Sequence, residues 1–343
     1  QVTGVQTCAL PISQVRYEYF FADGFFFSKD VNGSYYMVND GERWTLSSFS
    51  DEHVSVQPTL LQDGRIVYQP TLFALRKDAV QSSVTLKNSS GKAKIYRLDW
   101  TESQPLDVDL GTLDYRLIQE DGLTYVSLRS LVSGTYDNML ARYAREGAKA
   151  RGSKAVIYDL RGNVGGSDSW PRKWIQSFLG TQNSIETSML YAQKNSALFA
   201  AENSESLLPE DEGTCFAREV HGTWYENDIP IIVLVDDHCG SSGEGAVQLL
   251  KTLDNVLVVG SNTAGYQLCG NISTFTLPYT GIGVRFGSTL FLYGDGENVD
   301  HRGYVPDVWC DPQDALASVL ALLKEQGVVS ADACETVREK IVK

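Results

Sequence analysis

The chain has 343 residues, of which 43% are hydrophobic, so it can bury one large core or two smaller ones. Its 43 acidic and 29 basic residues give a net charge of -14, which argues against nonspecific binding to nucleic acid or anionic lipid. No apolar run reaches the roughly 18 residues of a membrane-spanning helix. We therefore expect no nucleic-acid partner and no membrane insertion by this chain.

The first residues, QVTGVQTCALPIS, do not begin with Met and resemble a translated sequencing adaptor of the kind found at the ends of metagenomic contigs. They lack the basic stretch and continuous apolar core of a signal peptide. We expect residues 1–13 to be non-native and the natural N-terminus to be missing.

Residues 14–103 alternate short β-rich runs with turn signals such as Asn39-Asp40-Gly41. This pattern predicts a small β module. The polar, proline-containing segment 101–109 is typical of a linker that leads into a second domain, residues 104–343.

After the linker, apolar strands alternate with amphipathic helices, which predicts a mixed α/β sheet covered by helices. Buried strands are predicted within SKAVIYDL, IPIIVLV and NVLVVGS, and helices within YDNMLARYAREGAKARG, WPRKWIQSFL and GEGAVQLLKTL. Two further helices are predicted at the end of the chain. The polar run ENSESLLPEDEGTC is expected to form an exposed loop.

A pair of serines follows one of these strands, in VLVDDHCGSSGEGAV (Val233–Val247). A strand, a glycine-containing turn and a helix start place Ser241 and Ser242 at the carboxyl edge of the sheet, where helix amides can hold an oxyanion. Ser241 to Glu244 also matches a capping box, so a purely structural role is the alternative. The stretch does not match the G-x-S-x-G turn of α/β-hydrolases.

Two other strand-end segments have related features. AVIYDLRGNVGGS ends a buried strand in a loop whose Gly165 and Gly166 let backbone amides approach a ligand. NVDHRGYVPDV places Asp300 and His301 before a turn fixed by glycine and proline. An ordinary surface turn is the alternative for each.

With VVGSNTAG between them, these segments resemble the tail-specific, C-terminal processing and tricorn-core-like serine peptidases. That family has D-L-R-x-N-x-G-G, S-x-x-E, G-x-x-T-x-G and G-V-x-P-D motifs in this order. Here the last motif reads Gly303-Tyr304-Val305-Pro306-Asp307, and the match extends over about Tyr115 to Leu323. The resemblance implies a crotonase-like peptidase core with Ser241 as the nucleophile. It also implies an oxyanion hole from the amides of Ser242 and of Gly165 or Gly166.

The catalytic base departs from the bacterial branch of the family, which has a lysine where this chain has Tyr266. The tricorn-like branch uses an N-terminal histidine, with an acidic residue whose place Asp300 takes here. His53, in FSDEHVSV, partly matches that histidine segment. Either His53 is the base, or the base belonged to the missing N-terminus.

The resemblance predicts a serine endopeptidase that acts on protein or peptide substrates, near their C-termini, in an extracytoplasmic location. It implies no metal and no cofactor, and the cysteines lack zinc-ligand spacing. The β module is either PDZ-like or a plain β subdomain. A non-catalytic ligand-binding protein on the same scaffold, similar to the retinoid-binding repeats, is the alternative function.

Overall fold

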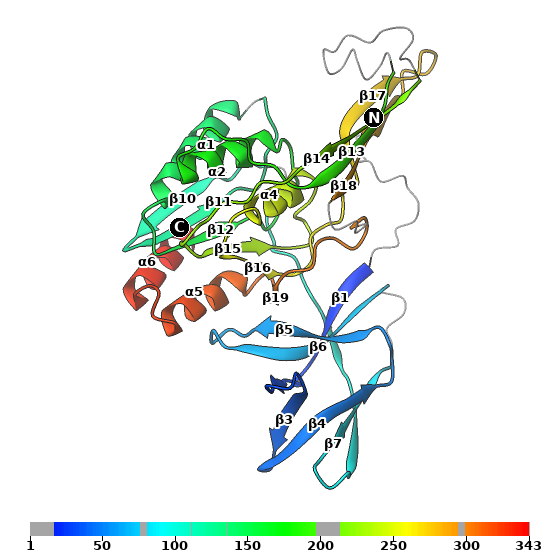
Figure 1. Ribbon diagram of the computed structural model, residues 1–343, viewed down its shortest axis with the longest axis vertical. Helices are drawn as coiled ribbons and strands as arrows, with labels where there is room; N and C mark the ends of the chain where they lie inside the picture. The colour runs from blue at the N-terminus through cyan, green and yellow to red at the C-terminus, as the bar shows by residue number, and fades with distance from the viewer. Residues whose placement is uncertain are drawn as a thin grey trace.

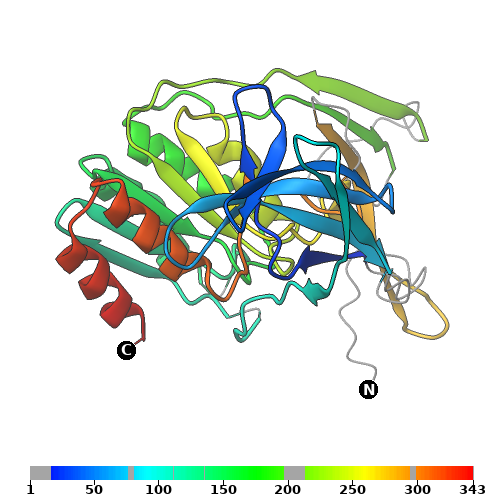
Figure 2. The ribbon, with the colours of Figure 1, turned by 90° about the horizontal axis from the view of Figure 1, so that it is seen from below.

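A computed structural model describes residues 17–75, 81–110, 112–134, 136–196, 213–293 and 299–342. A helix-covered sheet forms the body, and a narrow antiparallel sheet projects from it (Figure 1). Seen from below, the N-terminal strands, in blue and cyan, lie in front of that body (Figure 2). Residues 1–13 and most of the predicted polar loop lie outside the described residues.

The largest sheet contains ten strands from both halves of the chain. They are β1 (Tyr17–Ala22), β5 (Val54–Leu60), β6 (Ile66–Leu75), β9 (Trp100–Glu102), β10 (Arg116–Glu120), β11 (Leu123–Ser127), β12 (Ala155–Asp159), β15 (Ile231–Val235), β16 (Val256–Gly260) and β19 (Val308–Trp309). Their order is β10-β11-β12-β15-β16-β19-β5-β6-β1-β9. The strands from β11 to β5 pair in parallel, so the loops after β12, β15 and β16 meet at one edge.

Helices cover both faces of this sheet. They are α1 (Asp137–Ala150), α2 (Ser169–Leu179), α4 (Ser242–Leu250), α5 (Ala315–Glu325) and α6 (Ala331–Val342). Successive residues of a strand point to opposite faces, so Val156 and Tyr158 pack in one core with α1, α2 and α4. Ala155 and Ile157 pack in a second core with α5 and α6. The predicted mixed sheet with flanking helices is confirmed.

Two antiparallel sheets complete the fold. One consists of β2 (Ser28–Lys29), β3 (Tyr35–Asn39), β4 (Glu42–Phe49), β7 (Ser83–Lys87) and β8 (Ala93–Arg97), in that order. The other consists of β13 (Met189–Lys194), β14 (Cys215–Val220), β17 (Cys269–Thr276) and β18 (Gly283–Tyr293), in the order β14-β13-β18-β17. We call this second sheet the arm, because it stands away from the body (Figure 1).

The large sheet crosses the predicted boundary between residues 103 and 104. Trp309 of β19 pairs with Thr59 of β5, which joins strands of the N-terminal part to those of the C-terminal part. Trp44, Val84 and Leu86 of the five-stranded sheet share a core with Ala22 of β1, Val54 of β5 and Leu72 of β6, so this sheet packs on the N-terminal strands of the large sheet. The two-domain division therefore stays a proposal. Among the described residues, no helix is long and apolar enough to cross a bilayer.

Candidate active site

The strands β12 and β15 bring two of the sequence motifs together. They are parallel neighbours, with Asp159 opposite Leu234, so the loops that follow them leave the sheet side by side. The amide of Gly240 donates to the carbonyl of Asn163, 2.9 Å away, and ties the second loop directly to the first. The D-L-R loop and the paired serines are thus parts of one site.

Ser241 has the backbone conformation that distinguishes this site. It precedes α4 with φ 53° and ψ -123°, a combination that L-residues rarely adopt and that costs about 1–3 kcal/mol. Ser241 is exposed, whereas Gly243 and Glu244 in the helix that follows are buried. The turn therefore holds a serine hydroxyl at the surface, at the N-terminus of a helix.

The glycine loop packs directly against this serine. A Cβ placed on Gly165 would lie 2.8 Å from Cβ of Ser241 and 3.0 Å from the amide nitrogen of Ser242. With φ 97°, Gly165 also has a conformation that other residues avoid. No side chain fits between this loop and the serine turn.

Two glycine amides of this loop differ in their partners. The Gly165 amide donates to Oδ1 of Asn163 at 2.9 Å. Leu131 donates to the carbonyl of Gly165 and accepts from Ser167, so the backbone groups of Gly166 point away from Leu131. The Gly166 carbonyl accepts a hydrogen bond from the Ser242 hydroxyl, 3.0 Å away. The backbone of Gly166 therefore faces the start of α4.

The carboxylate of Glu244 joins three loops. Its Oε2 accepts from the amides of Ser241 and Tyr266, and its Oε1 accepts from Oγ1 of Thr263 and the amide of Gly265, at 2.6–3.0 Å. Thr263 Oγ1 in turn accepts from the Tyr304 amide, which connects the G-V-x-P-D turn. Burial raises the pKa of Glu244 to about 7, although these hydrogen bonds lower it. One buried acid thus orients the nucleophile turn and the two turns that follow it.

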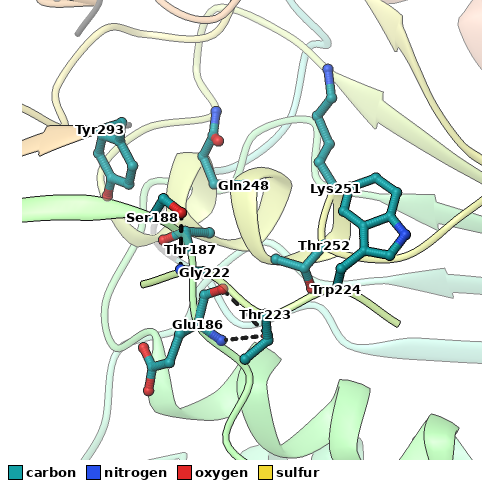
Figure 3. A pocket seen from close by; sticks show the side chains of 10 residues that line it. All are labelled: Glu186, Thr187, Ser188, Gly222, Thr223, Trp224, Gln248, Lys251, Thr252 and Tyr293. Carbon is teal, nitrogen blue, oxygen red and sulfur yellow. Dashed lines mark hydrogen bonds between the residues drawn. The ribbon is translucent and has the colours of Figure 1, made fainter. Parts of the chain in front are cut away.

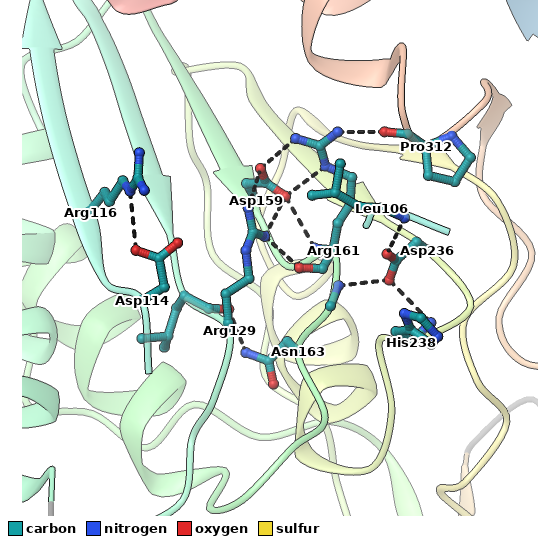
Figure 4. A network of polar contacts seen from close by, with 12 residues as sticks. Leu106, Asp114, Arg116, Arg129, Asp159, Arg161, Asn163, Asp236, His238 and Pro312 are labelled. Atoms are coloured by element: carbon teal, nitrogen blue, oxygen red, sulfur yellow. Dashed lines mark hydrogen bonds and ion pairs between the residues drawn. The ribbon is translucent and has the colours of Figure 1, made fainter. Parts of the chain in front are cut away.

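A second buried network supports the D-L-R loop (Figure 4). Asp159 lies between the guanidinium groups of Arg129 and Arg161, with N–O distances of 2.6–3.1 Å. Burial raises the pKa of Asp159, but the two arginines outweigh burial and hold it well below its usual range. Asp236 accepts from the amides of Gly162 and Leu106. The hydrogen bonds of these acids fix the backbone of the D-L-R loop beside the serine.

Asp300 lies where the arm leaves the body. Its Oδ1 accepts from the Leu268 amide at 3.2 Å, and the neighbouring His301 amide donates to the carbonyl of Gly265. Burial raises the pKa of the half-buried Asp300 carboxyl, while the Leu268 amide and His301 lower it. The structure therefore brings Asp300 to the segment that follows the G-x-x-T-x-G turn, beside the residues held by Glu244.

His53 precedes β5, and its imidazole Nδ1 lies 3.0 Å from Oδ1 of Asp51. Its side chain is 70% exposed. None of the four histidines, all of them in the described part of the chain, hydrogen-bonds to Ser241. The structure thus places an Asp–His pair near the start of β5 but does not connect it to the serine.

A separate cavity of about 480 Å³ lies beside α4 (Figure 3). It is lined by Glu186, Thr187, Ser188, Gly222, Thr223, Trp224, Gln248, Lys251, Thr252 and Tyr293. Gln248 and Lys251 lie at the opposite end of α4 from Ser241. Sequence reasoning did not find this cavity, because its lining comes from four separate segments of the chain.

A strained, exposed serine at a helix start, with a glycine loop packed against it on an α/β sheet, is an arrangement that suits a serine-type hydrolase. A family model, Peptidase family S41, matches residues 122–309, more than half of the chain. The chain belongs to peptidase family S41, a family of serine-type peptidases. This match confirms the predicted membership of a serine peptidase family.

Several solved structures are similar to the chain, and no curated protein matches it. A putative peptidase from Parabacteroides merdae is 23% identical over 65% of this chain and 68% of its own, with a TM-score of 0.41. A putative S41 protease from Bacteroides fragilis is 13% identical over 93% and 87%, with a TM-score of 0.42. A photosystem II D1 C-terminal processing protease is 15% identical over 86% and 73%, with a TM-score of 0.39.

Proposed function

We propose that this chain is a serine endopeptidase with Ser241 as its nucleophile. The observation that carries the proposal is the strained backbone of Ser241, which holds an exposed hydroxyl beside two glycines in a domain of family S41. The Ser241 oxygen attacks a peptide carbonyl carbon while its proton passes to a base, and the amine leaves with that proton. Water then hydrolyses the acyl-enzyme ester and releases the carboxyl product.

The oxyanion would be held by the amides of Ser242 and Gly166. Gly165 is the less suitable donor of the two predicted glycines, because its amide already donates to Asn163. Gly166 faces the start of α4, and Ser242 is a first-turn residue whose amide has no partner within the helix. Each such donor contributes about 3 kcal/mol to stabilising the tetrahedral intermediate.

For the base, we propose His53, with Asp300 helping to orient the site, as the tricorn-like branch of the family implies. Asp51 supports this proposal, because a carboxylate bonded to Nδ1 leaves Nε2 available to accept a proton. Thr59, six residues after His53, lies level with the carboxyl ends of β16 and β19, so His53 lies toward the opposite edge of the sheet from Ser241. The proposal therefore requires a rearrangement of the N-terminal strands that brings the ring to Ser241. Replacing His53 by alanine should abolish peptide turnover, and replacing the exposed His221 in the same way should not.

The test of the nucleophile uses a fluorophosphonate probe and casein turnover. The wild-type protein should be labelled and should cleave casein. Ser241→Ala should lose both, whereas Ser242→Ala, its matched control one residue away, should keep the label because its backbone amide remains. Equal labelling of the two variants would show that Ser241 is not the nucleophile.

The finer aspects of the function rest on the resemblance to the family. We propose substrates that are proteins or peptides cleaved near their C-termini, and an extracytoplasmic location. Comparing peptides with a free and an amidated C-terminus would test the first, since recognition of the terminus requires its carboxylate. Fractionation of cells that express the full-length protein would test the second.

One observation favours a second candidate, a non-catalytic ligand-binding protein. No described histidine is hydrogen-bonded to Ser241, so the observed arrangement does not pair the serine with a histidine. A saturable apolar-ligand titration, together with absent casein turnover and absent probe labelling, would favour this alternative.

A further inference from the structure

The arm exposes an apolar face that the proposed peptidase site does not use. Its strands pair so that Leu292 lies opposite Leu190 and Val284 opposite Phe275, and even-numbered residues of β18 share one side. That side, which we call the arm face, carries six large apolar residues that are each 37–46% exposed: Leu190, Phe275, Val284, Phe286, Leu290 and Leu292.

The opposite side of the arm is mixed. It carries Gln193, Arg218 and Arg285 together with the exposed Ile272 and the ring cluster of Tyr191, Phe216 and Phe291. The arm face itself carries one charge of each sign, Lys194 and Glu219. Antiparallel sheets usually turn their apolar side to a core and their polar side to water. The six large apolar side chains of the arm face are each more than one third exposed, which is the pattern of an interaction surface.

The size of the arm face suits a dimer interface. The four strands have 6, 6, 8 and 11 residues. At about 3.3 Å per residue and about 4.8 Å between strands, they cover about 500 Å². Two such faces that overlap completely bury about 1,000 Å², the lower limit for a specific interface.

The charge distribution favours the arm over the body as the contact between copies. The chain has a net charge of -14, so two bodies repel each other. The arm strands carry three basic residues, Lys194, Arg218 and Arg285, and one acidic residue, Glu219. An arm-to-arm contact therefore avoids most of the repulsion, especially if the bodies lie at opposite ends.

We propose that two copies of this chain associate through their arm faces, packed as two sheets with the arms running in opposite directions. Met189 and Tyr293 at the base of each arm are buried in the body, so the arm is anchored before it meets its partner. The contact is isologous, because the same face serves both copies. It is independent of the catalytic role of Ser241.

Sedimentation velocity of the full chain, from low concentration to about 100 µM, measures this association. We expect a dimer that Phe286→Asp weakens at least about 100-fold, because the substitution places two charges in the apolar contact. Ile272→Asp is the matched control: Ile272 is 43% exposed against 40% for Phe286, but lies on the opposite side of the same sheet. It should leave the dimer intact, and circular dichroism should show both variants folded.

Salt supplies a second measurement that does not depend on a variant. Raising NaCl from about 50 to about 500 mM should tighten the dimer, since it screens repulsion between the acidic bodies while the apolar contact remains. A wild-type chain that stays monomeric would overturn the proposal. So would a dimer that Phe286→Asp and Ile272→Asp affect equally, or one that salt dissociates.

Discussion

Ionisation of Glu244 is expected to change the stability and the activity of the protein in opposite directions as the pH rises. The folded-state pKa of Glu244, about 7, is above the ordinary value of 4.5, because burial of the carboxyl raises the pKa by more than its four hydrogen bonds lower it. The folded protein therefore binds the proton more tightly than the unfolded chain does. This contribution to stability is complete below pH 4.5 and is lost as the pH rises through about 7.

The magnitude follows from the difference between the two pKa values, at 1.36 kcal/mol for each factor of ten in proton affinity. Between about pH 5 and about pH 8, charging Glu244 should lower the free energy of unfolding by about 2–3 kcal/mol. The anion, however, is the form that accepts all four hydrogen bonds from Ser241, Thr263, Gly265 and Tyr266. Activity should therefore rise over the range in which stability falls.

Glu244→Gln isolates this effect. The amide keeps the shape of the side chain but cannot ionise, and its NH₂ group faces donors where an oxygen accepted them. Urea unfolding at the two pH values should show that the variant lacks the wild-type loss of about 2–3 kcal/mol. Its peptide turnover should be low at both values, with normal circular dichroism. A variant with the same pH dependence of stability as the wild type would refute the assignment.

Three further predictions concern the supports of the site. Gly165→Ala should lower kcat at least about 100-fold, because its Cβ would lie 2.8 Å from Cβ of Ser241. Gly91→Ala is the control, since Gly91 also has a positive φ but an added Cβ there would meet nothing within 4 Å. Equal activity of the two variants would contradict the packing argument. Asp159→Asn should cost about 3–5 kcal/mol in urea unfolding, because two buried arginines lose their counter-charge, and a loss below about 1 kcal/mol would mean that water replaces it. His53→Ala should abolish turnover while His221→Ala retains it, and full activity of the first variant would remove His53 from the mechanism.

The arrangement of the serine site could be predicted from local sequence. Apolar runs of strand length, each followed by a glycine turn and a helix, require the loops after β12 and β15 to emerge at one edge of a parallel sheet. The S-x-x-E pattern also predicted the bond from Glu244 to the amide of Ser241. These features depend on contacts within a few residues or on the regular geometry of parallel strands.

The rest depends on contacts between distant segments, which no local period encodes. The bonds from Glu244 to Thr263 and Tyr266 require the next strand, β16, to return its loop to the start of α4. The arm combines strands about 100 residues apart in sequence, β13 and β18, and its apolar alternation alone did not reveal whether a core covers it. The pairing of β5 with β19 could not be predicted from the sequence either, because the two strands belong to segments that were predicted as separate domains.

Three buried carboxylates hold the loops around the proposed nucleophile in place. They belong to Asp159, Asp236 and Glu244. Asp159 ends β12, Asp236 directly follows β15, and Glu244 lies in the first turn of α4. Asp159 and Asp236 both accept from amides of the D-L-R loop, Asp236 also accepts from the linker, and Glu244 accepts from the turns after β15 and β16. A buried charge is costly, so its partners must be held closely for the fold to tolerate it. That requirement fixes loop backbones more firmly than apolar contacts would. A strained residue such as Ser241 persists only where its surroundings leave it no alternative conformation, and these acids supply that constraint.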